Sequence, residues 1–199
     1  MAKRAFDLLL ASLGLMLLSP LLLLIGLAVK LDSPGPVFYC QQRVGRHGVP
    51  FRIHKFRTMV DSQAGDAPQI TVGADARITR VGSVLRRHKL DELAQLFDVL
   101  QGTMSFVGPR PEVPRYVAMY PPELRARVLS VRPGITDLAS IAFRNESELL
   151  ARAADPEREY VQVVMPQKLA LAASYADAPS LGLDLKIIWR TLRLLMGAQ

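Results

Sequence analysis

The sequence predicts an α+β fold that is mainly helical, with an N-terminal re-entrant membrane helix-break-helix, a small β-hairpin and amphipathic helices at the membrane interface. Three observations predict it. A long apolar stretch opens the chain, two short runs rich in β-branched and aromatic residues follow, and apolar residues then recur at helical spacing. We expect two parts, a membrane hairpin over residues 1–32 and a second domain over residues 33–199.

The apolar stretch runs from Ala5 to Val29, with Asp7 as its one charge. As a straight helix it would measure roughly 38 Å, enough to cross a hydrocarbon core about 30 Å thick. Ser19 and Pro20 interrupt it. Proline removes a helical N–H and clashes one turn back, at Met16, so we expect a kink there that breaks the stretch into two helices, with the Ser19 hydroxyl able to satisfy a freed carbonyl. Each half is then too short to span the bilayer.

Basic residues flank the apolar stretch at both ends. By the positive-inside tendency this pattern places both ends in the cytoplasm and indicates a re-entrant hairpin in one leaflet. A kinked single-pass helix is the alternative. A cleaved signal peptide is not favoured, because no small-residue cleavage site follows a short apolar core. The basic residues are Lys3, Arg4, Lys30, Arg43, Arg46, Arg52, Lys55 and Arg57.

A β-hairpin is predicted directly after the membrane segment. Residues 33–36 read Ser-Pro-Gly-Pro, a turn signal that ends the apolar part. Val37 to Cys40 and Val49 to His54 are the expected strands, joined by a turn over residues 45–48.

Two cations follow the second strand. Alternation places Lys55 and Arg57 on one side of an extended chain, where they could grip a diphosphate. An exposed basic strand edge that guards against aggregation is the alternative. Residues 61–79 are polar and predict a loop that could close over a ligand.

An acidic pair, Asp91 and Glu92, follows the basic run Arg86–Lys89 and opens a helical pattern. Unpaired N–H groups at a helix start make a positive field, which would keep a carboxylate ionised and could hold a phosphate. A capping Asp with a solvated basic patch is the alternative interpretation. The expected apolar face holds Leu93, Leu96, Phe97 and Leu100, and the opposite face holds Asp91, Gln95 and Asp98.

Arg110 stands between Pro109 and Pro111, which limit where its guanidinium can point. A pre-set arginine suits a phosphate or a carboxylate, because its planar fork binds two oxygens at once. Otherwise the segment is a rigid loop. Further on, Arg144 precedes an acidic helix start at Glu146.

Two helices are predicted near the C-terminus. Asp155-Pro156 opens the first, which we expect to bend at Pro166 and to end near Asp177. Ser180 caps the second, a basic amphipathic helix suited to a membrane surface, with core packing as the alternative. Its apolar face holds Leu181, Leu185, Ile188, Leu192 and Leu195, and Lys186, Arg190 and Arg193 crowd another face.

Composition excludes several classes of protein. The one cysteine, Cys40, rules out an intramolecular disulfide, and three scattered histidines offer no zinc spacing. The sequence contains no P-loop, dinucleotide fingerprint or Ser-His-Asp order. The net charge of +7 arises from a basic excess in residues 1–90, beside the apolar segment. This suits an anionic membrane surface or a phosphorylated substrate, and nucleic acid is not expected because aromatic platforms are lacking.

The order of short motifs is more specific than any motif alone. The motifs are the Ser19-Pro20 break, Gly35-Pro36-Val37-Phe38, Arg43-Val44-Gly45, Lys55-Phe56-Arg57-Thr58-Met59, Leu90-Asp91-Glu92-Leu93, Ser105-Phe106-Val107-Gly108-Pro109-Arg110-Pro111 and Arg132-Pro133-Gly134-Ile135-Thr136. In this order they closely resemble the small monotopic phosphoglycosyltransferases, bacterial sugar transferases that load a polyprenyl phosphate. The resemblance covers nearly the whole chain.

This resemblance implies transfer of a sugar-1-phosphate from a UDP-sugar to undecaprenyl phosphate, with release of UMP and a requirement for Mg²⁺. It implies a phosphosugar-enzyme intermediate, with Asp91 as nucleophile and Glu92 helping to hold the metal. The candidates for a cationic clamp on the diphosphate are Lys55, Arg57, Arg86, Arg110 and Arg144. The expected location is the cytoplasmic face of the bacterial inner membrane, with residues 33–199 as the catalytic domain and the interfacial helices around the active site.

The chain departs from the family pattern after Thr136, where Asp137 and Ser140-Ile141-Ala142-Phe143-Arg144 replace a Gly and a Gln-Val-Asn-Gly-Arg run. Residues 155–178 match no family segment that we can identify and could set the choice of sugar. A non-catalytic basic membrane adaptor in polysaccharide assembly is the alternative function. The sequence leaves the oligomeric state open, a homo-oligomer included.

Overall fold

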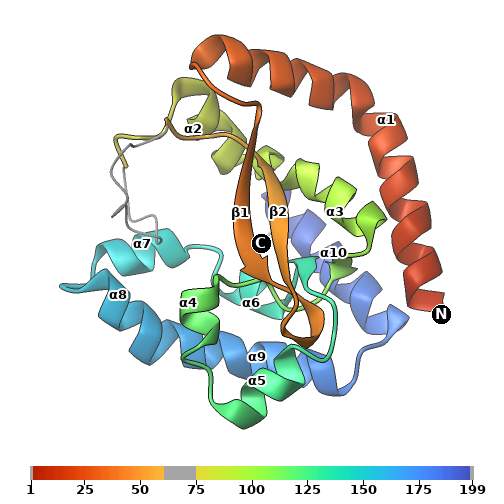
Figure 1. The fold of residues 1–199 in the computed structure, drawn as a ribbon, viewed down its shortest axis with the longest axis vertical. Helices are drawn as coiled ribbons and strands as arrows, with labels where there is room; N and C mark the ends of the chain where they lie inside the picture. The colour runs from red at the N-terminus through yellow and green to blue at the C-terminus, as the bar shows by residue number, and fades with distance from the viewer. Residues whose placement is uncertain (1, 61–74, 198–199) are drawn as a thin grey trace.

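The computed structural model describes residues 2–60 and 75–197, and it is mainly helical (Figure 1). The loop predicted over residues 61–79 therefore lies mostly outside the described residues. The helices are α1 (Ala2–Asp32), α2 (Arg80–Arg87), α3 (Gln95–Gln101), α4 (Pro114–Val117), α5 (Pro122–Val128), α6 (Leu138–Ala142), α7 (Glu146–Ala151), α8 (Pro156–Glu159), α9 (Met165–Asp177) and α10 (Leu181–Leu195). The strands are β1 (Phe38–Val44), β2 (Pro50–Phe56), β3 (Ser105–Val107) and β4 (Gly134–Thr136).

Helix α1 is continuous, so the predicted break into two helices is wrong: Pro20 lies inside the helix. The Ser19 hydroxyl donates to the Met16 carbonyl at 2.9 Å, as expected for a backbone group that proline leaves unpaired. Because this bond replaces the missing one, the helix bends without ending, and the bend is visible near its middle (Figure 1). Among the described residues α1 is the one helix long and apolar enough to cross a membrane.

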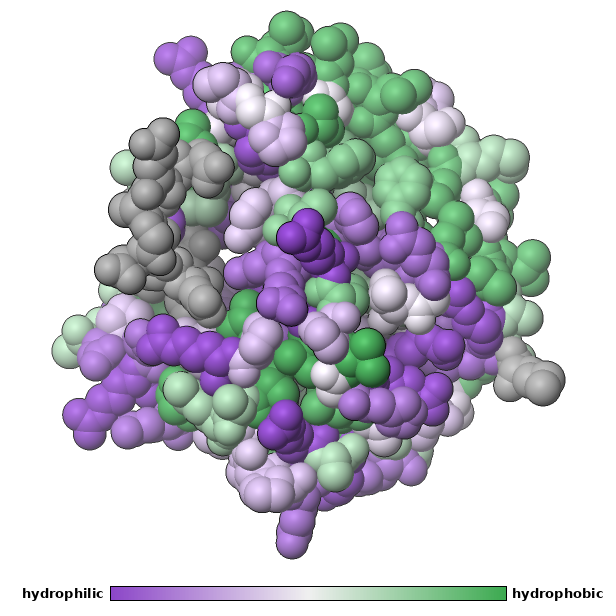
Figure 2. All heavy atoms as spheres, viewed as in Figure 1, coloured by the Kyte–Doolittle hydropathy of each residue, from purple (hydrophilic) through white to green (hydrophobic). Residues whose placement is uncertain are grey.

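Both ends of α1 are tied to the same folded body. Near the N-terminus, Lys3 forms an ion pair with the buried Asp184 at 2.6 Å. One turn on, Asp7 is buried and accepts the backbone N–H of Phe106 at 3.1 Å, which explains the charge within the apolar stretch. At the other end, Asp32 accepts a backbone N–H from the first turn of α2. Between these anchors most apolar side chains of α1 are exposed, and they form an apolar surface (Figure 2).

Strands β1 and β2 form the predicted hairpin. They pair antiparallel from Phe38 opposite Phe56 to Val44 opposite Pro50, and the connection is a 3₁₀ turn over Arg46–Gly48. The strands are longer than predicted, because pairing extends them to the edge of the turn. The hairpin lies across the middle of the molecule (Figure 1), and β2 contacts the 3₁₀ turn Leu90–Ala94 that contains the acidic pair.

Strands β3 and β4 form a parallel pair that the sequence analysis did not predict. Their pairing places Gly108 and Gly134 back to back: a Cβ on Gly134 would lie 2.1 Å from the Gly108 nitrogen. Glycine is therefore required at this crossing. The motifs around residues 105–111 and 132–136 are thus two halves of one structural unit.

The buried side of helix α3 overlaps the expected apolar face only in part. Leu96 is buried as predicted, but Gln95 and Asp98 are 1% and 0% exposed, whereas Phe97 and Leu100 are 39% and 36% exposed. The buried carboxylate of Asp98 is satisfied by His54, whose backbone N–H donates to it at 2.9 Å. An apolar outer face suits a helix that lies against lipid.

The C-terminal helices begin and end close to the predicted residues. Asp155 caps α8, and a π turn over Tyr160–Val164 connects α8 to α9 just before Pro166. Proline lacks the N–H that the α-helical ladder needs, so a distortion at this place is expected. The largest core cluster packs around this turn and includes Val113, Tyr116, Val128, Leu150, Tyr160, Val164, Met165 and Leu169.

Helix α10 begins at the predicted cap, where the Ser180 hydroxyl accepts the Leu183 N–H. Ile187 packs in the core, but Leu185, Trp189 and Leu192 are 55%, 61% and 47% exposed. Core packing therefore accounts for a narrow strip of this helix only. The exposed strip is the apolar face that the sequence predicts for membrane contact.

Candidate functional site

One large open cavity brings together all seven predicted catalytic and substrate-binding residues, which come from five separate parts of the chain. The hairpin, helix α2, the turn before α3, the segment after β3 and helices α6, α7 and α10 contribute to its wall. The seven residues are Lys55, Arg57, Arg86, Asp91, Glu92, Arg110 and Arg144.

The acidic pair lies in a 3₁₀ turn, Leu90–Ala94, that leads into α3. The cap position is Lys89, in a left-handed conformation with φ 56°, and no side chain caps the turn. Asp91 is 8% exposed, and its Oδ1 is buried with no hydrogen-bond partner in the described part of the chain. The interpretation of Asp91 as a helix cap is therefore wrong.

The pKa of Asp91 is raised by burial first and by the charge of Glu92 second. The local sequence pattern predicts the opposite direction, because the field of a helix start favours the charged carboxylate, but the desolvation imposed by the fold has the larger effect on the pKa of Asp91. A buried carboxylate oxygen without a donor is costly for a folded protein. Such an oxygen is suited to bonding with a group that comes from outside the chain.

Glu92 is held by two cations. It accepts from the Lys55 ammonium at 2.9 Å and from both terminal nitrogens of Arg110, the longer contact being 3.3 Å. Burial opposes its ionisation, but the charges of Arg110 and Lys55 hold the pKa of Glu92 well below its usual range. The two neighbouring carboxyl groups thus have opposite shifts, a pattern typical of catalytic pairs.

Arg110 is fixed through its backbone as well as by its proline neighbours. Its N–H donates to Asp137 at 3.1 Å, and the same carboxylate caps α6 through the Ser140 N–H at 2.7 Å. The charge of Glu92 raises the pKa of Arg110. Asp137 thus fastens the Arg110 segment to the α6 wall of the cavity.

Arg57 lines the cavity but is directed at the backbone. It is 6% exposed, and its guanidinium donates to the carbonyls of Val29, Ser33, Pro34 and Pro36, where α1 ends. These contacts satisfy carbonyls that a helix C-terminus leaves unpaired. Because these carbonyls occupy the guanidinium, Arg57 is not directed at a diphosphate in the cavity.

The other predicted cations lie farther around the wall. Arg86 is half-buried, with its guanidinium 3.6 Å from the Met59 sulfur, and Arg144 is exposed. The cavity also contains an ion pair that sequence analysis missed, between Lys168 and Glu146 at 2.9 Å. No local signal marks this pair, because the two residues come from different helices.

Known proteins resemble the chain over nearly its full length. A family model described as bacterial sugar transferase matches residues 1–198. A UDP-glucose:undecaprenyl-phosphate glucose-1-phosphate transferase from Caulobacter vibrioides is 42% identical over 199 residues, which cover 98% of this chain and 69% of that protein. A UDP-N-acetylgalactosamine-undecaprenyl-phosphate N-acetylgalactosaminephosphotransferase from Aeromonas hydrophila is 37% identical, over 98% of this chain and 43% of that protein.

An undecaprenyl-phosphate glucose phosphotransferase from Komagataeibacter xylinus is 42% identical over 96% of this chain, but the match covers only 35% of that protein. The chain thus spans less than half of the Aeromonas and Komagataeibacter relatives.

Proposed function

The chain belongs to the bacterial sugar transferase family, and from this premise we propose that it transfers a sugar-1-phosphate from a UDP-sugar to undecaprenyl phosphate, with release of UMP. The observation that carries the proposal is the acidic pair: a buried Asp91 oxygen without a partner, beside a Glu92 that two cations hold ionised. The names of the relatives support the two substrates. The reaction would be an early membrane step of bacterial glycan assembly.

In the first step, Asp91 Oδ1 forms a bond to the phosphorus that carries the sugar. The bond from this phosphorus to the bridging oxygen breaks, and UMP leaves with the electron pair. In the second step, a phosphate oxygen of undecaprenyl phosphate attacks the same phosphorus and releases Asp91. Splitting the transfer in this way lets one site serve a dissolved donor and a lipid acceptor in turn.

The cations of the site reduce the repulsion between the Asp91 carboxylate and the negatively charged diphosphate that it attacks. Lys55 and Arg110 already face Glu92, so they lie beside the point where the donor phosphates must approach Asp91. Arg86 and Arg144 extend the positive wall of the same cavity. Fixed charges of this kind stabilise the charge that develops in a phosphoryl-transfer transition state.

Mg²⁺ fits this donor set, although the described residues hold no cluster of three or more His, Cys, Asp or Glu side chains. Magnesium is usually bound by one or two carboxylates together with substrate phosphates. Glu92 retains acceptor capacity beyond its two cations and would hold the ion beside the substrate phosphates, while Asp91 Oδ1 stays available to attack phosphorus. When bound, the ion would supply further charge neutralisation at the diphosphate.

The attachment of α1 supports the re-entrant arrangement. Its N-terminal end contacts Asp184 and Phe106, and its C-terminal end contacts Arg57 and the start of α2, so both ends touch one polar body. A helix that crossed the bilayer would separate its ends by the membrane. We therefore propose that α1 enters and leaves on the cytoplasmic face of the inner membrane, with α3 and α10 at the interface.

A cysteine-labelling experiment tests this topology. In a Cys40→Ser background, Ala2→Cys and Leu31→Cys are expected to react with a membrane-impermeant maleimide from the cytoplasmic side only. Both native residues are exposed, Leu31 by 78%, and Cys40 is removed because it is exposed too. Labelling of the two positions from opposite sides would mean that α1 crosses the bilayer.

A substrate panel tests the reaction itself. UDP-glucose and UDP-N-acetylgalactosamine, offered with undecaprenyl phosphate and Mg²⁺, are expected to give UMP with at least one donor, and the yield should fall to background with EDTA. Two controls omit the acceptor or supply undecaprenol in its place. If no UDP-sugar in a wider panel is consumed, the transferase proposal is wrong and the membrane adaptor becomes the better hypothesis.

A further inference from the structure

We propose that Tyr160 is a positioning residue for this transfer: acting through Glu112, it fixes the Pro109–Arg110–Pro111 turn and so holds Arg110 against Glu92. The inference rests on the proposed function. It also gives a role to the segment 155–178, which the family resemblance did not explain. Tyr160 does not line the main cavity, so it would act only through the residues it contacts.

The first link is a buried hydrogen bond. The Tyr160 hydroxyl, on a side chain whose residue is 4% exposed, donates to Glu112 Oε2 at 2.6 Å. The other oxygen, Oε1, accepts from Arg43 at 3.2 Å and from the Val113 N–H at 2.9 Å. Three donors therefore fix the orientation of one carboxylate.

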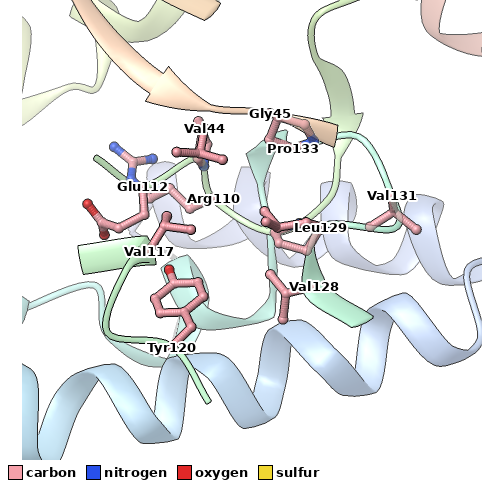
Figure 3. A pocket seen from close by; sticks show the side chains of 12 residues that line it. Val44, Gly45, Arg110, Glu112, Val117, Tyr120, Val128, Leu129, Val131 and Pro133 are labelled. Atoms are coloured by element: carbon pink, nitrogen blue, oxygen red, sulfur yellow. The ribbon is translucent and has the colours of Figure 1, made fainter. Parts of the chain in front are cut away.

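The second link joins this carboxylate to the turn. The guanidinium nitrogen of Arg43 that contacts Glu112 also donates to the Pro111 carbonyl at 3.1 Å. The Val44 N–H donates to the Glu112 carbonyl at 2.9 Å. The turn is thus fastened to β1 through Arg43 and Val44, and a small, mainly apolar cavity lies beneath it (Figure 3).

The charge of Glu112 also affects the two arginines near the turn, Arg43 and Arg110. Arg43 and Arg110 are close enough to repel: burial and then the charge of Arg110 lower the pKa of Arg43, while Glu112 raises it. Glu112 therefore neutralises Arg43 and leaves Arg110 to face Glu92. Burial and the charge of Glu112 raise the pKa of Tyr160, so its hydroxyl stays protonated and remains a donor.

The position of Tyr160 is itself tightly defined. It opens the π turn before Pro166, a distortion that in other helices is often found at functional sites. Its ring packs against that of Tyr116, with centroids 5.0 Å apart, and the ammonium of Lys168 lies 5.0 Å from its centroid. A ring fixed by two neighbours can transmit its position to Glu112.

The test is Tyr160→Phe, which removes the hydroxyl and keeps the ring. We expect kcat for UMP release to fall about tenfold with a smaller change in KM, because Arg110 acts mainly on charge that develops in the transition state. Tyr120→Phe is the matched control. Tyr120 lines the small cavity together with Glu112, but Tyr160 is the tyrosine that donates to this carboxylate, so kcat of Tyr120→Phe should stay within about twofold.

A double-mutant cycle separates positioning from general structural support. In an Arg110→Lys background, Tyr160→Phe is expected to have little further effect, because the group that it positions has been replaced. Effects of the two substitutions that multiply would mean that Tyr160 acts independently of Arg110 and would overturn the inference. A Tyr160→Phe enzyme with wild-type kcat would overturn it as well.

Hydrogen exchange gives a readout that needs no activity. The amides of Arg110, Glu112 and Val113 should exchange faster in Tyr160→Phe than in wild type or Tyr120→Phe, since the turn loses one of its anchors. Unchanged exchange would contradict the positioning role even if kcat fell. If the wild-type protein releases no UMP, the proposed function fails, and this measurement still decides whether Tyr160 fixes the turn.

Discussion

Asp91→Asn is expected to lower UMP release by at least about 10³-fold, because an amide oxygen cannot form the covalent bond to phosphorus that the proposed mechanism requires. The buried Oδ1 of Asp91 has no other function in the described contacts, so its loss should affect chemistry and leave the fold intact. The measurement is UMP release with the best donor. Intact-protein mass spectrometry with donor alone should show a sugar-phosphate adduct on wild type and none on the variant.

The matched control is Asp177→Asn. Asp177 is exposed and pairs with Arg127 outside the cavity, so activity should stay within about twofold. Normal turnover in Asp91→Asn, or an adduct that maps to another residue, would remove the nucleophile assignment.

The same variant has an expected effect on stability. The folded-state pKa of Asp91 is raised, so between its unfolded and folded pKa values the folded protein binds more protons than the unfolded protein. The free energy of unfolding of the wild-type protein therefore falls as pH rises through that window. The Asp91→Asn variant has no carboxyl group at this position, so its free energy of unfolding does not fall for this reason. In metal-free buffer at neutral pH the variant should be more stable by about 1 kcal/mol, and the difference should vanish at a pH below the ordinary Asp range. A variant less stable than wild type at neutral pH would contradict this.

Arg110→Ala is expected to lower kcat/KM by about 10²–10³-fold, the usual cost of removing one group that stabilises transition-state charge. It removes the strongest partner of Glu92 and leaves Lys55 as the remaining cation in contact with that carboxylate. Arg110→Lys should recover part of the activity, because a lysine keeps the charge but loses the paired N–H donors. Steady-state kinetics over a range of UDP-sugar concentrations would measure both variants.

Arg115→Ala is the control for Arg110. Arg115 also pairs with a glutamate, Glu157, but both side chains are about half exposed and neither lines the cavity. Its loss should change kcat/KM by less than about twofold. If the two substitutions lowered kcat/KM equally, Arg110 would act through the overall charge or the folding of the protein and would have no specific role in the site.

Local sequence patterns predicted the elements whose structure depends on near neighbours. The bend at Ser19-Pro20, the β1–β2 hairpin and the caps at Asp155 and Ser180 were confirmed, because each depends on residues within a few positions of one another. The same patterns overestimated the effect of Pro20 on α1, which continues through it as one helix. A single proline removes one hydrogen bond, and a helix that recovers it by a serine hydroxyl does not need to end.

Burial and long-range contact were the sources of error. The field expected to ionise Asp91 is local, but the desolvation that raises its pKa comes from the whole cavity wall. The direction of the Arg57 side chain depends on where α1 ends, more than twenty residues earlier in the chain. The β3–β4 pair joins segments that no short window contains together.

By itself, the sequence determined that an apolar bent helix precedes a hairpin and an acidic pair, and that cations are available near that pair, since residue type and spacing fix these features. Only the tertiary structure decided which carboxylate is free and which is clamped, which arginine faces the pair and which caps a helix. Those outcomes depend on desolvation and on contacts between residues distant in the chain, and both arise only when the chain is folded.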